Sequence, residues 1–170
     1  ADRDFVRRTL LAAAMTLANS HRVTGDLDAA NDLATDAVAR FLRLFGQEHP
    51  LPLSAMVNHA VVLRAQGDYE QARRLDEVSH ARMSKNLGTQ HGYTLCALNG
   101  LAIDLAQSDK PERARTLFDD ALAISQQTRG PRHPYTLACA ANAAKAMQAE
   151  NDHRRLALLD RAIAGLAEAL

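Results

Sequence analysis

The sequence predicts an all-α fold of four repeats, each made of two helices, and two observations lead to this prediction. The first is composition: 47% of the residues are hydrophobic, but only 4% are aromatic and tryptophan is absent. The apolar residues are therefore mostly alanine and leucine, which favour helices, whereas strands are rich in β-branched and aromatic residues. The second observation is a constant internal step of 42 residues, which leads from His49 to His91 and then to His133.

The step recurs in the segments between helices and in the apolar positions. His-Gly-Tyr-Thr-Leu at 91–95 matches His-Pro-Tyr-Thr-Leu at 133–137, and His-Pro-Leu-Pro-Leu at 49–53 precedes both by the same step. Apolar columns keep the step without gaps: Leu11, Leu53, Leu95 and Leu137; Leu33, Leu75, Leu117 and Leu159; Ala18, Ala60, Ala102 and Ala144. Because chance does not explain such columns, we expect one domain over 1–170 with repeats near 3–45, 46–87, 88–129 and 130–170.

Each repeat contains two turn signals, which set the expected helices. The first helix of each repeat is expected over 9–24, 51–66, 93–108 and 135–150, and the second over 27–45, 69–87, 111–128 and 153–169. Gly-Asp or a substitute marks the turn within a repeat. Gly-x-x-His-Pro marks the turn between repeats, since glycine suits the left-handed end of a helix and proline its first turn. The alanine columns mark places where two helices cross closely.

Charge and cysteine content exclude several classes of protein. Twenty basic residues balance twenty acidic ones and the pI is about 7.3, which argues against nucleic acid or a basic membrane contact. The sequence has no run of eighteen apolar residues that would predict a transmembrane helix. Two cysteines, Cys96 and Cys139, form neither a disulfide framework nor a metal-binding spacing. We expect reduced thiols and a cytoplasmic location.

No sequence motif points to catalysis, a cofactor or a metal. The P-loop, the Gly-x-Gly-x-x-Gly fingerprint, Gly-x-Ser-x-Gly and His-Glu-x-x-His are all absent from the sequence. Acidic neighbours such as Asp76 and Glu77 diverge on a helix and do not face one substrate. We therefore expect a protein that is not an enzyme, with no catalytic residues and no cofactor.

The seven histidines have two interpretations. One histidine precedes the first helix of each of the last three repeats, and these three are expected to stabilise the turns because they lie too far apart to share a metal. His21, His59 and His80 occupy positions usually filled by core leucine. They indicate either hydrogen-bonded histidines in a loosely packed layer or a core sensitive to pH or metal. We expect no metal site.

These residues resemble the tetratricopeptide repeat family. The resemblance is carried by Ala60 and Ala102, by the Gly-Asp-Tyr turn at 67–69, and by Ala72 and Ala114. The commonest repeat of that family has about 34 residues. The 42-residue form with Gly-x-x-His-Pro between repeats is similar to the kinesin light chain subtype, and the segment 67–77 resembles bacterial, actinobacterial versions. Asp76 and Asp160 depart from the pattern, since the family usually has an aromatic residue there.

The resemblance implies a right-handed α-solenoid of eight helices whose first helices line a concave groove. By register, the following residues face this groove: Asn19, Arg22, Asn58, Val61, Arg64, Asn99, Ile103, Gln107, Asn142, Lys145 and Gln148. An asparagine amide offers a donor and an acceptor to an extended main chain. Arg22, Arg64 and Lys145 favour an acidic segment. The chaperone-tail clamp of the family is not expected, since Met15, Cys96 and Gly100 replace its cations.

The leading hypothesis is a non-catalytic module that binds a protein or peptide in this groove. The alternative is a sensor or oligomerisation segment of a larger signal-transduction ATPase of the NB-ARC or STAND type, and the chain is expected to be a fragment of a larger protein. A third expectation concerns the C-terminal edge, where an apolar stripe is formed by Leu156, Leu159, Ile163, Leu166 and Leu170. This stripe predicts a homodimer through that edge.

Overall fold

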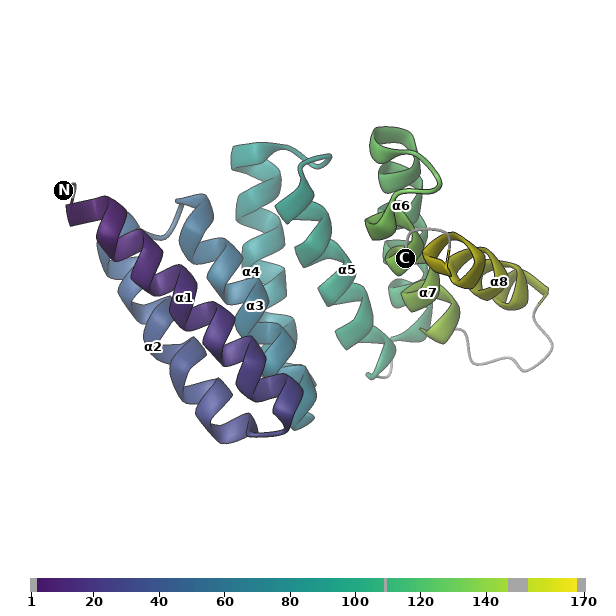
Figure 1. Cartoon of the computed structure of the whole chain (residues 1–170). Helices are drawn as coiled ribbons and strands as arrows, with labels where there is room; N and C mark the ends of the chain where they lie inside the picture. The colour runs from purple at the N-terminus through teal and green to yellow at the C-terminus, as the bar shows by residue number, and fades with distance from the viewer. Residues whose placement is uncertain (1–2, 109, 147–152, 168–170) are drawn as a thin grey trace. The chain divides into compact units, whose positions relative to one another are not determined.

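The computed structural model describes residues 3–108, 110–146 and 153–167, and the side chains of residues 145, 146 and 166 are also left undescribed. These ranges form eight helices and contain no strand (Figure 1). Their bounds are α1 (Arg3–Thr24), α2 (Leu27–Phe45), α3 (Pro50–Gln66), α4 (Tyr69–Leu87), α5 (Gly92–Ala106), α6 (Pro111–Arg129), α7 (Pro134–Ala146) and α8 (His153–Ala167).

Most ends of the predicted helices are confirmed to within two residues. The largest difference is at α1, which begins at Arg3 and not at residue 9. The first repeat lacks the His-Pro entry of the others, and Asp4 occupies the first turn, where a carboxylate favours a helix. The expected helical residues 147–150 and 168–169 lie outside the described residues.

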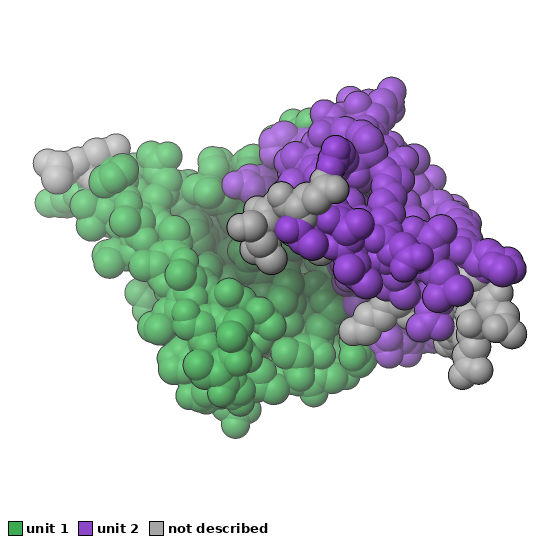
Figure 2. Space-filling view, turned by 45° about the vertical axis from the view of Figure 1, so that its right-hand side comes forward, with its two compact units in different colours: residues 1–88 green, residues 89–170 purple. Residues whose placement is uncertain are grey.

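Contacts between residues divide the chain into two compact units, unit 1 over Ala1–Gly88 and unit 2 over Thr89–Leu170 (Figure 2). The division falls at a predicted boundary between repeats. In unit 1, α2 packs against α1 and α3, α3 packs against α4, and α1 touches α3. In unit 2, α6 packs against α5 and α7, α7 packs against α8, and α5 touches α7.

The core of unit 1 is built around small side chains. Ala18, Ala30 and Ala34 are fully buried and form a cluster with Val62, which joins α1, α2 and α3. A second cluster contains Leu11, Ala37, Phe41 and Ala55 from the same three helices. The repeated alanines therefore lie where the sequence predicts close helix crossings.

The core of unit 2 has larger apolar contacts and one buried polar pair. Phe118 of α6 lies in a cluster with Leu101 and Leu105 of α5 and Ala143 of α7. Thr136 and Ser125 share a buried hydrogen bond of 2.7 Å between their hydroxyl oxygens, which links α7 to α6.

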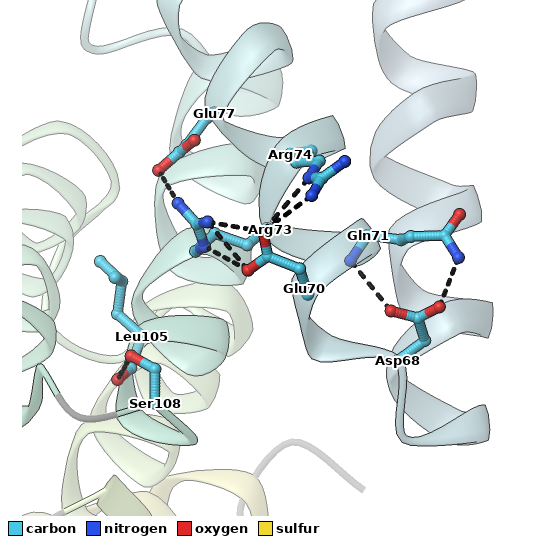
Figure 3. Close-up of polar contacts among 8 residues, drawn as sticks. All are labelled: Asp68, Glu70, Gln71, Arg73, Arg74, Glu77, Leu105 and Ser108. Atoms are coloured by element: carbon cyan, nitrogen blue, oxygen red, sulfur yellow. Dashed lines mark hydrogen bonds and ion pairs between the residues drawn. The ribbon is translucent and has the colours of Figure 1, made fainter.

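Side chains and glycines fix the ends of the helices. Asp68 Oδ1 accepts a hydrogen bond from the backbone N–H of Gln71 at 3.0 Å and caps α4 (Figure 3). Gly67 ends α3 in the left-handed conformation with φ of 84°, which glycine adopts without strain. The Nδ1 atoms of three histidines accept from backbone N–H groups two residues later, at 3.1–3.2 Å: His49, His91 and His133. Their predicted role in stabilising the turns is confirmed.

The length and hydropathy of the described helices bear on whether they could span a bilayer. None of them is both long enough and apolar enough to cross a membrane.

Candidate functional site

The predicted groove residues of α1 are joined to each other. Asn19 is exposed and Arg22 is half-buried. Arg22 donates from Nε and Nη2 to Asn19 Oδ1, at 3.0 and 2.9 Å. The amide NH₂ of Asn19 stays available, while its carbonyl oxygen is already an acceptor for the arginine.

The groove residues of α3 differ sharply in their surroundings. Asn58 is exposed, and its amide has no hydrogen bond to any described residue; Val61 is half-buried. Arg64 instead turns toward α4, where its Nη1 lies 2.7 Å from Asp76 Oδ2. Only 12% of the Arg64 side chain and none of the Asp76 side chain are exposed. The described contacts of Arg64 thus include a buried ion pair between α3 and α4.

Sequence reasoning missed this ion pair. The sequence marks Asp76 as an acidic neighbour of Glu77 and as a departure from an aromatic position, and it marks Arg64 as a cation of the groove. A signal was present in the register: one repeat later, the same two positions hold Ala106 and Phe118. Phe118 is buried there and Ala106 packs against its cluster, so both positions face the interior of a helix pair.

In unit 2, the groove residues of α5 are partly enclosed. Asn99 is half-buried, and its Oδ1 is buried without a hydrogen-bond partner among the described residues. Ile103 packs against the cluster around Phe118. Gln107 is exposed and forms the C-terminal cap of α5, where its backbone N–H donates to Asp104 O and Leu105 O.

The predicted site continues on α7 with a single described side chain. Asn142 is half-buried and its amide has no hydrogen bond to any described residue. Gln148 and the side chain of Lys145 lie outside the described residues.

The histidines predicted at core positions are hydrogen-bonded. His59 Nε2 on α3 lies 2.8 Å from Asn31 Oδ1 on α2, and burial lowers the pKa of His59. Burial also lowers the pKa of His80, whose Nε2 lies 3.3 Å from Ser84 Oγ. Among the described residues, no three histidine, cysteine or acidic side chains gather as metal ligands. These contacts favour the hydrogen-bonded interpretation of the two histidines.

Cys96 and Cys139 form no disulfide. Cys139 is buried on α7, and this burial raises the pKa of its thiol to about 11. A thiol with so high a pKa stays protonated near neutral pH and reacts slowly.

The acidic residues of α4 form ion pairs with arginines. Arg73 bridges Glu70 at 2.9 Å and Glu77 at 2.7 Å on the surface of the helix (Figure 3). Hydrogen bonds from Arg73 and Arg74 lower the pKa of Glu70. Asp76, the neighbour of Glu77, is buried against α3. The two acidic neighbours face different directions and do not converge on one site, as the sequence predicts.

Comparisons with solved structures show the fold. BtubC (BKLC) from P. vanneervenii is 20% identical with a TM-score of 0.74, and the match covers 94% of this chain but only 64% of BtubC. A Podosopora anserina chain, described as a kinesin light chain with nearly identical TPR-like repeats, is 20% identical with a TM-score of 0.56. That match covers 95% of this chain and 97% of the other. No curated protein matches the sequence significantly.

The family is shown by the sequence itself. The model of the tetratricopeptide repeat matches three times, over residues 9–85, 51–127 and 93–167. Each match spans two of the predicted repeats, and successive matches begin 42 residues apart. These comparisons confirm the predicted fold class, an all-α solenoid of such repeats. They also confirm the predicted resemblance to kinesin light chains. Since the matches extend from residue 9 to residue 167, the chain belongs to the tetratricopeptide repeat family.

Proposed function

We propose that this chain is a non-catalytic module that binds an extended protein segment along the groove side of the first helices of its repeats. Tetratricopeptide repeats are generally protein–protein interaction modules on a scaffold that typically carries no catalysis. The observation that carries the proposal is the set of available asparagine amides on these helices. Asn58 on α3 and Asn142 on α7 occupy the same register position, and neither amide is hydrogen-bonded to a described residue.

The chemistry of these amides suits a main chain. An extended segment presents one N–H and one C=O per residue, and a single amide side chain can pair with both. Rigid helices hold such amides in place, so binding costs little ordering of the receptor. A preference for an acidic segment rests on Arg22 in unit 1, because the charge of Arg64 is opposed by Asp76.

Four further expectations stay predictions. They are a single domain over 1–170, a cytoplasmic location, a homodimer through the C-terminal edge, and the alternative role within a larger signal-transduction ATPase. The dimer prediction rests on α8, where Leu156 and Ile163 are 51% and 66% exposed. Leu170 and the side chain of Leu166 lie outside the described residues. Sedimentation of the isolated chain tests the dimer, because Ile163→Glu would dissociate it.

The binding proposal is tested by site-specific crosslinking. A photo-crosslinking amino acid is placed at position 58, on the groove side of α3, and in a matched protein at position 78, where Val78 is exposed on α4. After irradiation in extracts of the source cells, the crosslinked proteins and segments are identified by mass spectrometry. We expect one partner segment to be enriched at position 58 and absent at position 78. Equal capture at both positions, or capture at 78 alone, would contradict a site on the first helices.

A further inference from the structure

An apolar stripe runs along the outer side of α1. Val6, Leu10, Ala13 and Leu17 follow the four-three-four spacing of one helix face and are all exposed, Leu10 by 65% and Leu17 by 49%. Most of the large apolar side chains exposed in the described parts of the chain belong to α1 and the end of α2. Such a concentration on one helix marks a surface that another molecule covers.

The second repeat shows what covers this face of a first helix. Three of the four positions one repeat later lie on α3, and two of them, Ala55 and His59, contact α2. Ala55 lies in a cluster with Ala37, and His59 Nε2 is 2.8 Å from Asn31 Oδ1. In this repeat the face is therefore occupied by the second helix of the preceding repeat.

The fourth repeat, in unit 2, shows the same arrangement. Thr136 on α7 shares a hydrogen bond with Ser125 on α6. Cys139 packs in a cluster with Leu122 of α6, and Ala143 belongs to a cluster with other α6 side chains. In both repeats the positions of Ala13 and Leu17 contact the preceding antiparallel helix, whereas on α1 these positions are exposed.

A basic hollow of about 280 Å³ adjoins the stripe at the seam of α1 and α2. Three leucines form its apolar part and three arginines its charged part: Leu10, Leu11, Leu44, Arg7, Arg40 and Arg43. Arg40 pairs with Asp36 at 2.7 Å, and Arg7 lies 3.5 Å from Asp4. Arg43 has no ion-pair partner among the described residues. The hollow therefore offers positive charge to an incoming carboxylate.

The next repeat indicates which end of a docked helix this hollow receives. Arg82 and Asn86 lie one repeat after Arg40 and Leu44. Arg82 Nη1 donates to Gln47 O at 3.1 Å, and Asn86 Nδ2 donates to Glu48 O at 2.9 Å. These two carbonyls directly follow the C-terminal end of α2. The hollow thus corresponds to the place where the C-terminal end of a covering helix lies.

We propose that the stripe of α1 and the basic hollow bind an amphipathic helix of a partner protein, antiparallel to α1 and with carboxylates in its last turns. The apolar face of that helix covers Leu10 and Leu17, as α2 covers α3. Its C-terminal end carries partial negative charge, and its carboxylates pair with Arg43 and the neighbouring arginines.

Charge argues against a second copy of this chain in a symmetric pairing of two α1 helices. In that arrangement the hollow faces the part of α1 that follows Asp4 in the other copy, and this part, residues 5–24, contains no carboxylate. Arg43 would then gain no carboxylate, whereas an acidic helix supplies one.

The test uses a labelled peptide taken from this chain. Residues 27–45 form α2, which covers the equivalent face of α3, but they carry Arg40 and Arg43 near their C-terminal end. The probe is this peptide with both arginines replaced by glutamate, and the unchanged peptide is its matched control. Fluorescence anisotropy measures binding to the 170-residue chain. We expect the acidic peptide to bind about tenfold or more tightly than the control, with an affinity that falls as salt rises.

Variants of the protein locate the site. Leu10→Glu with Leu17→Glu is expected to abolish binding, and Arg43→Glu to remove the preference for the acidic peptide. Val78→Glu is the matched control, because Val78 is an apolar side chain of α4 that is 38% exposed, and this variant is expected to bind as the wild type does. Circular dichroism checks that each variant is folded. If the double leucine variant unfolds, the loss of the peptide preference in Arg43→Glu is the result that locates the site.

Four results would overturn the proposal. The first is no binding of the acidic peptide, and the second is equal binding of both peptides. The third is sedimentation as a dimer that Leu17→Glu dissociates, which would assign the face to a second copy. The fourth is co-sedimentation with phosphatidylserine vesicles that Leu17→Glu abolishes, which would assign it to a membrane surface.

Discussion

The two compact units fill the same pair of repeat positions with opposite chemistry. In unit 1, Arg64 and Asp76 form a buried ion pair of 2.7 Å between α3 and α4. In unit 2, the corresponding positions on α5 and α6 hold Ala106 and Phe118, which pack in an apolar cluster. Both solutions join the two helices of a repeat at the same place, so the register determines which positions meet but not which chemistry they use.

The ion pair and the apolar pair differ in the free-energy cost of a substitution. Replacing a buried ion pair by apolar residues of suitable volume is often neutral or stabilising, because desolvation offsets much of the Coulomb attraction. Removing one member is costly, since the other charge stays buried with a lost partner. We therefore expect unit 1 to tolerate a matched exchange at these positions better than a single change.

The largest effect is expected from Asp76→Ala in unit 1. It leaves Arg64, with only 12% of its side chain exposed, without this carboxylate, and the free energy of unfolding should fall by about 3–5 kcal/mol. Urea unfolding followed by circular dichroism measures the loss. The double variant Arg64→Ala with Asp76→Phe copies unit 2 and should be more stable than Asp76→Ala alone. If the double variant is the less stable of the two, the positions are not interchangeable.

The next effect is expected in unit 2 from Gly165→Ala. A Cβ at this position would lie 2.6 Å from Cδ1 of Leu137, a side chain that is 1% exposed. Overpacking should lower stability by about 1–3 kcal/mol, although alanine is the better helix former by about 1 kcal/mol. Gly92→Ala is the control, because its Cβ meets only the end of the Arg129 side chain and no buried apolar residue. A Gly165→Ala protein as stable as the wild type would show that α7 and α8 separate easily.

A smaller and equal effect is expected from the histidine caps of both units. His49→Ala in unit 1 and His91→Ala in unit 2 each remove an acceptor that lies 3.2 Å from a backbone N–H. The loss of a helix N-cap costs about 1 kcal/mol. Thermal unfolding of the two variants should show similar decreases. A cost confined to one unit would mean that the repeated histidines do not have the same role.

The smallest effect is a pH dependence that belongs to unit 1. Burial lowers the pKa of His59 and of His80 below the ordinary 6.5. The unfolded chain therefore binds protons first as pH falls below about 6.5, so stability is retained above that value and declines beneath it. Urea midpoints measured across this range should decrease toward acid. In His59→Gln the urea midpoint should decrease less toward acid. An unchanged dependence on pH would show that His59 does not contribute to it.

The helices were predictable because each boundary has a local signal. Gly67-Asp68 and the Gly-x-x-His-Pro segments determine where the chain turns, independently of distant residues. The start of α1 at Arg3 was not predicted, because the first repeat lacks such a signal and the helix continues to its first charged residues.

The site residues were harder to predict, and the physical reason is side-chain length. Register assigns a position to a helix face, and this suffices for a short side chain such as Asn58, which is exposed. A long side chain at the edge of a face can turn either way. Arg64 turns inward because a buried carboxylate on α4 attracts it, and only the structure locates that partner.

The most direct test of the binding account is the affinity of the crosslinked segment for the variant Asn58→Ala with Asn142→Ala. Each hydrogen bond between an amide and the main chain contributes about 1 kcal/mol, so we predict that the dissociation constant rises about tenfold or more. The melting temperature should stay nearly unchanged, because surface substitutions alter stability by only about 0.5 kcal/mol. An unchanged affinity in a folded double variant would contradict the account and would place the binding surface elsewhere on the chain.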